Sequence, residues 1–308
     1  KKHKLQKLLN IDKKIKDLYV IYKKKYELKN DIIRNKIYLK YSKYRDFPID
    51  ILFKKNNHNP KAIIICLQGA NSGAHLNYEK VILPNDYIKV KNKSGNALHA
   101  TLNNCIAVSY ERIGYGERQE KSIKTKNNST TTFNIDPSLS YLMFGRTLIG
   151  ESINELNALT AFLKKKYKNL PIYVIGYSDG GALAMAFSAL NNKIDGVAIS
   201  GCVGSFRDTV LKRTQTGLLN IPNFLNYFDM GVFIELIASR YCLIISATDD
   251  HIWPYRLTKK VFDDVRNTYK NKKVKFNCKL VKVKGGHKYY PKELWDNLIL
   301  ELNKNACK

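Results

Sequence analysis

Short apolar runs alternate with amphipathic segments along most of the chain. The apolar runs are rich in β-branched residues, as strands buried on both faces are, and they lie at 62–67, 105–110, 172–175, 194–200 and 241–247. Segments with helical periodicity follow or separate them, at 139–167, 182–187, 255–269 and 290–302. A last strand is expected at 274–283. This alternation predicts an α/β protein with a mostly parallel central sheet and helices on both faces.

The first part of the chain follows other patterns. Apolar and polar residues alternate at 34–42 and 47–54, which predicts an N-terminal antiparallel hairpin leading into the sheet. Residues 1–30 are lysine-rich with apolar residues at helical spacing, which predicts an amphipathic helix. We therefore divide the chain into a basic N-terminal helical extension, residues 1–30, and one α/β domain, residues 31–308. Within that domain the less regular segment 201–240 is a candidate cap or rim of the substrate pocket.

Ser178 occupies the most informative turn. The stretch 171–181, Pro-Ile-Tyr-Val-Ile-Gly-Tyr-Ser-Asp-Gly-Gly, indicates a strand, a tight turn and the start of a buried helix. Gly-x-Ser-x-Gly in that context is typical of a nucleophile elbow, where a strained backbone pushes the serine hydroxyl out of the sheet and small neighbours let strand and helix pass closely. We expect Ser178 to be a nucleophile; the alternative is a bystander serine in a glycine-rich turn.

A serine nucleophile needs a base, and the base needs a carboxylate to orient it. His287 lies in a Gly-Gly-His loop after the last expected strand, at the sheet edge where Ser178 also emerges, so it is the expected base. Asp249 and Asp250 both follow the strand at 241–247 and compete for the role of acid. We favour Asp250, because it begins Asp-His-Ile-Trp-Pro, whose Ile and Pro would anchor the loop.

Two preorganised N–H donors are needed for the tetrahedral oxyanion. The amide of Asp179, directly after Ser178, is expected to be one of them. The second is expected at Ala70, in the small-residue loop 68–73 that follows the strand at 62–67.

Charge changes this picture less than its size suggests. The net charge is +27, but only ten of the 53 basic residues are arginine. Proteins that read nucleic acids rely on arginine for bidentate contacts, and the chain has no module with aromatic residues interleaved among arginines, so no nucleic-acid partner is expected. The excess of lysine indicates one of two things. Either it reflects the overall amino-acid composition and lies on a solvated surface, or it mediates peripheral contact with an anionic surface through the basic N-terminal helix.

The cysteines and the hydropathy bear on the compartment. The six cysteines show no Cys-x-x-Cys spacing, which is typical of inert core thiols in a reducing compartment and gives no metal-ligand motif. Neither an apolar run of membrane length nor a signal-peptide pattern is visible. We therefore expect a cytoplasmic protein.

With these residues placed, the chain from about residue 34 to 302 resembles the α/β-hydrolase superfamily and, within it, the acetyl xylan esterase and dienelactone-hydrolase-like branch. The resemblance is carried by Leu67-Gln-Gly-Ala-Asn-Ser-Gly-Ala-His-Leu76, Gly114-Tyr-Gly-Glu-Arg118, Gly145-Arg-Thr-Leu-Ile-Gly150, Gly176-Tyr-Ser-Asp-Gly-Gly181, Asp250-His-Ile-Trp-Pro254 and Gly286-His287. It implies a catalytic triad of Ser178, Asp250 and His287, an oxyanion hole of the Ala70 and Asp179 amides, and hydrolysis of short acyl esters, often acetyl groups on sugars, without metal or cofactor. Gln68 departs from the pattern, because many relatives carry His there, but the expected donor is a backbone amide.

These features predict a serine carboxylic-ester hydrolase that removes short, acetyl-type groups from a sugar or small metabolite through an acyl-enzyme on Ser178. An amidase or peptidase would use the same triad. The hypothesis from a different class is a catalytically silent binding protein on this fold, held on an anionic surface by its lysines. Arg118 and Arg146 are expected to pair with loop carboxylates such as Glu117 and Glu151 rather than to bind substrate.

Overall fold

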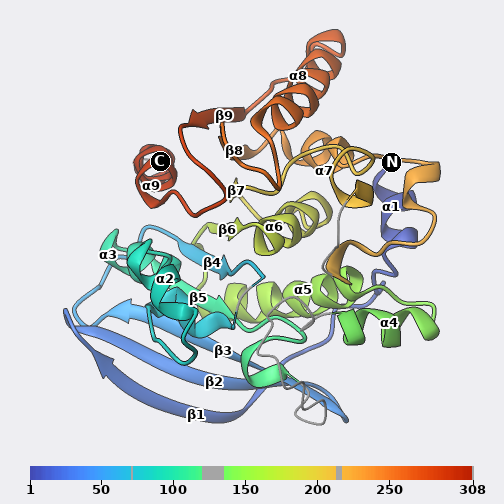
Figure 1. Ribbon diagram of the computed structural model, residues 1–308. Coiled ribbons are helices and arrows are strands. Elements are labelled where there is room, and N and C mark those ends of the chain that lie inside the picture. Colours follow the sequence, from blue (N-terminus) through green and yellow to red (C-terminus); the bar gives the residue numbers. More distant parts are fainter. Residues whose placement is uncertain (71, 120–134, 213–216, 307–308) are drawn as a thin grey trace.

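The computed structural model describes residues 1–70, 72–119, 135–212 and 217–306. Its strands are β1 (Tyr19–Leu28), β2 (Ile32–Ser42), β3 (Arg45–Lys54), β4 (Ile63–Leu67), β5 (Ile106–Tyr110), β6 (Ile172–Tyr177), β7 (Gly196–Ser200), β8 (Tyr241–Ala247) and β9 (Cys278–Val283). They form one nine-stranded sheet in the order β1-β2-β3-β5-β4-β6-β7-β8-β9 (Figure 1).

The sheet is antiparallel at its N-terminal end and parallel elsewhere. β1, β2, β3 and β5 pair antiparallel, whereas every pair from β5 through β4 to β9 is parallel. The hairpin expected from the alternating pattern is the β2–β3 pair. The prediction of an α/β protein with a mostly parallel sheet and an N-terminal antiparallel hairpin is therefore confirmed.

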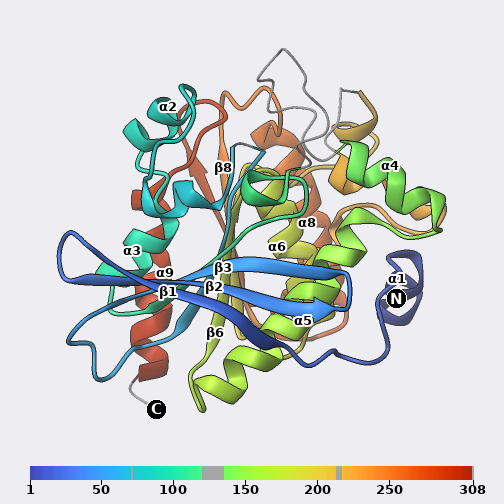
Figure 2. The same cartoon turned by 90° about the horizontal axis from the view of Figure 1, so that it is seen from below.

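Helices cover both faces of the sheet, as Figure 2 shows along the sheet edge. One face packs against α3 (Asn96–Leu102) and α9 (Pro291–Ala306), and short α2 (Asp86–Lys91) lies near α3. The other face packs against α5 (Leu148–Lys166), α6 (Asp179–Leu190), α7 (Gly231–Ile237) and α8 (Tyr255–Asn271). Two buried clusters result, because alternate side chains of the central strands point to opposite faces.

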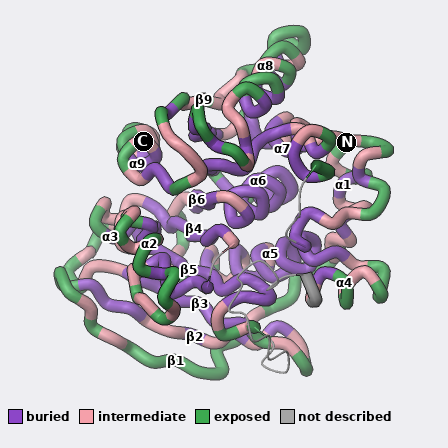
Figure 3. Tube along the Cα trace, in the orientation of Figure 1, coloured by how far each residue is buried: buried purple, intermediate pink, exposed green. Residues whose placement is uncertain are grey.

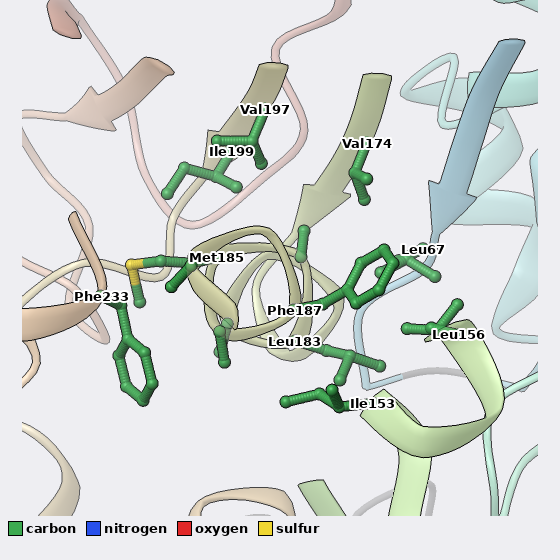
Figure 4. Close-up of a cluster of buried hydrophobic side chains, with 14 of the residues drawn as sticks. Leu67, Ile153, Leu156, Val174, Leu183, Met185, Phe187, Val197, Ile199 and Phe233 are labelled. Carbon is green, nitrogen blue, oxygen red and sulfur yellow. The ribbon is translucent and has the colours of Figure 1, made fainter. Parts of the chain in front are cut away.

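Helix α6 is the centre of the larger cluster (Figure 4). All twelve of its residues are buried, as expected for a helix that is apolar on every side and enclosed by the sheet and neighbouring helices. Leu183 and Phe187 point toward Ile153 and Leu156 of α5, and Met185 points to the opposite side. Each such side chain contributes about 1.5–3 kcal/mol of burial free energy, so the helix that begins at the elbow is held firmly.

The helix predicted over residues 1–30 is wrong beyond its first turns. α1 spans only Lys2–Leu8, and residues 19–28 form β1, the exposed edge strand of the sheet (Figure 3). Helical spacing of the apolar residues misled the prediction, because Tyr-Val-Ile-Tyr at 19–22 favours an extended chain and pairing with β2 satisfies its backbone groups.

Two further boundaries differ from the expected ones. The helix predicted at 139–167 is divided into α4 (Ile135–Met143) and α5, because Gly145 adopts a φ of +66° and Thr147 caps α5 by accepting a hydrogen bond from Gly150 N at 3.1 Å. The strand predicted from residue 274 begins at Cys278.

The described part of the candidate cap consists of short turns and α7. The turns are η4 (Val210–Lys212), η5 (Gly217–Leu219) and η6 (Phe224–Asn226). Ser138 Oγ of α4 donates to Gly217 O at 2.7 Å, so this segment packs on the helices at the α5 side of the sheet. In the residues that the structure describes, no helix is both long and apolar enough to cross a bilayer.

Candidate active site

Ser178 lies between β6 and α6 in a strained turn. Its φ of +53° and ψ of −125° are unfavourable for a residue with a side chain, at a cost of about 1–3 kcal/mol. The turn is as tight as the sequence predicts. A Cβ on Gly180 would lie 2.3 Å from the carbonyl oxygens of Leu67 and Gln68, so only glycine lets α6 pass the end of β4.

The structure brings Ser178, His287 and Asp250 together. His287 Nε2 lies 3.1 Å from Ser178 Oγ, and His287 Nδ1 lies 2.8 Å from Asp250 Oδ2. A carboxylate only accepts hydrogen bonds, so Nδ1 carries the proton and Nε2 is left to accept the serine hydroxyl. This order of contacts is the one that general-base activation of a serine requires.

Asp250, rather than Asp249, contacts the histidine. Asp250 is 3% exposed, and its Oδ1 accepts the N–H groups of Ile252 and Trp253, each at 2.8 Å. Burial by itself would raise the pKa of this carboxyl, but the hydrogen bond and charge of His287 and the two backbone N–H groups outweigh burial and place the pKa below its ordinary value. Asp249 is exposed.

Ala70 and Asp179 lie at the carboxyl ends of the strands, where Ser178 also lies. Leu67 of β4 pairs in register with Gly176 of β6, so the loops that follow these strands emerge side by side. A Cβ built on Gly69 would lie 3.3 Å from Ser178 Cβ, which places the residue before Ala70 against the elbow. Asp179 is the first residue of α6, so its amide belongs to the N-terminal end of that helix.

No protein-family model matches the chain, and no curated protein matches it. Solved structures do. A candidate acetyl xylan esterase from Bacteroides fragilis gives a TM-score of 0.74 at 16% identity over 98% of this chain and 86% of that one. A glucuronoyl esterase from Solibacter usitatus gives 0.69 at 11% identity over 99% and 91%. Acetyl xylan esterase 1 from Thermoanaerobacterium sp. gives 0.57 at 13% identity over 98% and 92%.

The chain has the α/β-hydrolase fold. The resemblance stated from the motifs is thereby confirmed at the level of the fold. In this fold the candidate residues Ser178, Asp250 and His287 follow β6, β8 and β9, and the carboxyl ends of these parallel strands converge.

Two buried residues beside the elbow were not identified from the sequence. Arg112 and Tyr115 follow β5, and both contact the Asp179 side chain. Their signal was weak but present, since a charged pair at 111–112 directly follows an apolar strand at the edge where α/β-hydrolase sites form.

A second serine, histidine and aspartate lie together in the 72–86 segment. Ser72 Oγ and Asp86 Oδ2 each lie 3.0 Å from the same nitrogen of His75, Nε2. A relay of the catalytic kind needs both ring nitrogens, one for each partner. Asp86 also accepts the N–H groups of Ile82 and Leu83, so this cluster holds the loop in shape.

Other polar residues singled out from the sequence have structural roles. Gln68 Nε2 donates to Asn77 Oδ1 at 2.8 Å and to Ser94 O at 2.9 Å.

Arg146 pairs with Glu151, as predicted. Arg118 pairs with Glu155 of α5 instead of Glu117, because Glu155 is fully buried and offers both oxygens, at 2.7 and 2.8 Å. In the described part of the chain, no group of three His, Cys, Asp or Glu residues is arranged to hold a metal ion.

The candidate site is distinct from a hollow of about 910 Å³ on the β1–β2 side of the molecule. Its wall includes Tyr22, Tyr26, Tyr38 and Tyr78, and Ser178 is not part of it. The Ser178 hydroxyl therefore sits half-buried at the carboxyl end of β6 and does not line this hollow.

Proposed function

We propose that the protein is a serine carboxylic-ester hydrolase that removes short, acetyl-type groups from a sugar or small metabolite. The observation that carries the proposal is the unbroken chain of contacts from Ser178 Oγ through both nitrogens of His287 to Asp250. Structural neighbours described as acetyl xylan and glucuronoyl esterases support the ester class.

The chemistry follows from this geometry in two halves. His287 Nε2 takes the Ser178 proton as Oγ attacks the ester carbonyl, and Asp250 stabilises the imidazolium. The Ala70 and Asp179 amides hold the oxyanion. Collapse of the tetrahedral species expels the alcohol, which receives the proton from His287. Water then attacks the acyl-enzyme with His287 as base, which releases the acid and restores the serine.

Turnover of p-nitrophenyl acetate, butyrate and octanoate by wild type and Ser178→Ala tests the proposal. We expect wild-type activity that is highest on acetate and a loss of at least ~10⁴-fold in kcat for the variant, because removal of a triad nucleophile has effects of this size. Thermal melting of both proteins is the control for folding. Equal turnover by the two proteins would refute the assignment of Ser178.

Three further measurements separate the other functions. Matched ester and anilide substrates distinguish an esterase from an amidase or peptidase. A silent binding protein would resist covalent labelling of Ser178 by a fluorophosphonate and would bind vesicles of anionic lipid in a salt-sensitive manner. The basic residues available for that contact include Lys23, Lys24 and Lys25, which are exposed on β1 rather than on a long helix.

A further inference from the structure

Arg112 connects the two segments that carry the proposed oxyanion donors. Its side chain is buried, at 4% exposure, although it carries a permanent charge. Nη2 donates to Gly69 O at 2.6 Å, and Nη1 lies 3.5 Å from Asp179 Oδ2. The guanidinium also lies 4.2 Å from the centre of the Tyr115 ring, whose hydroxyl donates to the same Asp179 oxygen at 3.4 Å.

The contact with Gly69 O fixes the direction of the Ala70 N–H. The Gly69 carbonyl and the Ala70 amide belong to one planar peptide unit, and the described chain has no cis peptide bond, so O and H point to opposite sides. A glycine permits this peptide to rotate more freely than any other residue would. A charged donor on the carbonyl stops that rotation and, by polarising the amide, strengthens the N–H as a donor.

The contact with Asp179 concerns charge. Asp179 supplies the second proposed donor through its amide. Its side chain, however, places a carboxylate beside Ser178, where the substrate's oxyanion would form. Two negative charges so close would raise the energy of the transition state in a water-poor site. Arg112 and Tyr115 hold this carboxylate and offset its charge.

We propose that Arg112 is the positioning residue of the oxyanion hole. One guanidinium aims the Ala70 N–H and neutralises Asp179, so both donors reach the oxyanion with the correct geometry and field. This inference rests on the proposed esterase function. It requires arginine in particular, because lysine is a point charge without the planar pair of donors that bridges two acceptors.

The test compares Arg112→Lys and Arg112→Met with a matched arginine far from the site. Arg240 also donates to backbone carbonyls, those of Ser188, Asn191 and Ile194, and it lies directly before β8 at the opposite edge of the sheet. Kinetics on p-nitrophenyl acetate, thermal melting and inhibition by an alkyl boronic acid are measured for Arg112→Lys, Arg112→Met and Arg240→Lys. The boronic acid forms a tetrahedral adduct with the serine, so its affinity reports the oxyanion hole directly.

For Arg112→Lys we expect kcat to fall about 10²–10³-fold with KM changed less than about threefold, the effect of losing one oxyanion donor. Boronic acid affinity should fall by a similar factor, because the inhibitor resembles the transition state. Arg240→Lys should melt earlier but keep kcat and inhibitor affinity.

Three outcomes would overturn the inference. One is that Arg112→Lys keeps the wild-type kcat and inhibitor affinity, which would refute the role of Arg112 but not the proposed esterase function. Another is an equal loss of kcat in Arg112→Lys and Arg240→Lys, which would indicate general destabilisation. A wild-type protein without hydrolase activity would refute the proposed function and the inference together. If Arg112→Met does not fold, Arg112→Lys alone decides.

Discussion

Glu111 shows how one buried side chain sets a pH response. It is 5% exposed beside the 72–74 turn, where Oε1 accepts the Ala74 N–H at 2.9 Å. Burial raises the pKa of this carboxyl to about 7 against the opposing effect of that hydrogen bond. The unfolded value is about 4.3, so between these pH values the folded protein binds more protons than the unfolded chain.

Stability contributed by Glu111 is therefore present below about pH 4 and lost as the pH rises through about 7. We predict that the free energy of unfolding of wild type falls between pH 5 and 8 relative to Glu111→Gln, by up to ~1.4 kcal/mol per pH unit. Urea unfolding of both proteins at pH 5, 6, 7 and 8 measures the difference. Parallel curves for the two proteins would contradict the prediction.

Glu235 provides the control, because it does not act on Glu111. It is partly buried on α7, and although burial would raise its pKa, hydrogen bonds from Lys1 and Lys272 place the pKa below the ordinary value. Its contribution to stability is present at neutral pH and lost only as the pH falls below about 4. Glu235→Gln should therefore leave the slope between pH 5 and 8 as it is in wild type.

At the scale of elements, a buried ion pair joins α5 to the loop after β5. Both Glu155 oxygens bind Arg118, and the Tyr110 hydroxyl donates to Glu155 at 2.6 Å. The Glu155 side chain is 0% exposed and that of Arg118 is 10% exposed. Removal of Glu155 leaves the Arg118 charge buried without its carboxylate partner, which is far more costly than removal of both.

We predict that Glu155→Gln lowers the free energy of unfolding by about 3–5 kcal/mol, and that Glu155→Leu with Arg118→Met together costs less than the single change. Urea unfolding of the single and double variants measures the coupling. Asp263→Asn, which breaks the exposed Lys259 pair on α8, is the control and should leave stability nearly unchanged. A double variant that costs as much stability as the single change, or more, would contradict the prediction.

At the scale of the whole molecule, the N-terminal segment is built into the core. Leu5 and Leu9 are 0% exposed, and a Cβ on Gly150 would lie 1.6 Å from Leu9 O, so α1 and the start of α5 are in direct contact. Thr147 Oγ1 also donates to Leu9 O at 3.1 Å. The helical pattern at residues 1–8 therefore marks a packed element, whereas residues 19–28 form the edge strand of the sheet.

Leu9→Ala should cost about 2–5 kcal/mol of stability, since a fully buried leucine leaves a cavity when it is truncated. Leu300→Ala is the control, because Leu300 is 60% exposed on α9 and its truncation should change stability by no more than about 0.5 kcal/mol. Chemical unfolding of both variants checks the contrast. An N-terminal segment that merely touches the surface would give two equal, small effects.

The sequence by itself determined the elements that depend only on residues close together in the chain. The apolar run, the Gly-x-Ser-x-Gly turn and the buried helix at 171–190 specify the elbow, because strand preference, small residues at close approach and helix burial all act within a few residues. The placement of Ser178, Asp250 and His287 at the ends of three parallel strands follows from the same alternation, since parallel strands bring their carboxyl ends to one edge.

Only the tertiary structure decided the features that depend on residues far apart in the chain. Residues 19–22 have apolar residues at helical spacing, yet they form a strand that pairs with β2. The edge of the sheet satisfies their backbone N–H and C=O groups, and the pattern of side chains carries no information about that partner. The choice between Asp249 and Asp250 as the partner of His287, the bridge from Arg112 to Gly69 and Asp179, and the raised pKa of Glu111 all arise from contacts or burial created by folding. Electrostatics and register are set by three-dimensional neighbours, and these neighbours lie tens of residues apart in the chain.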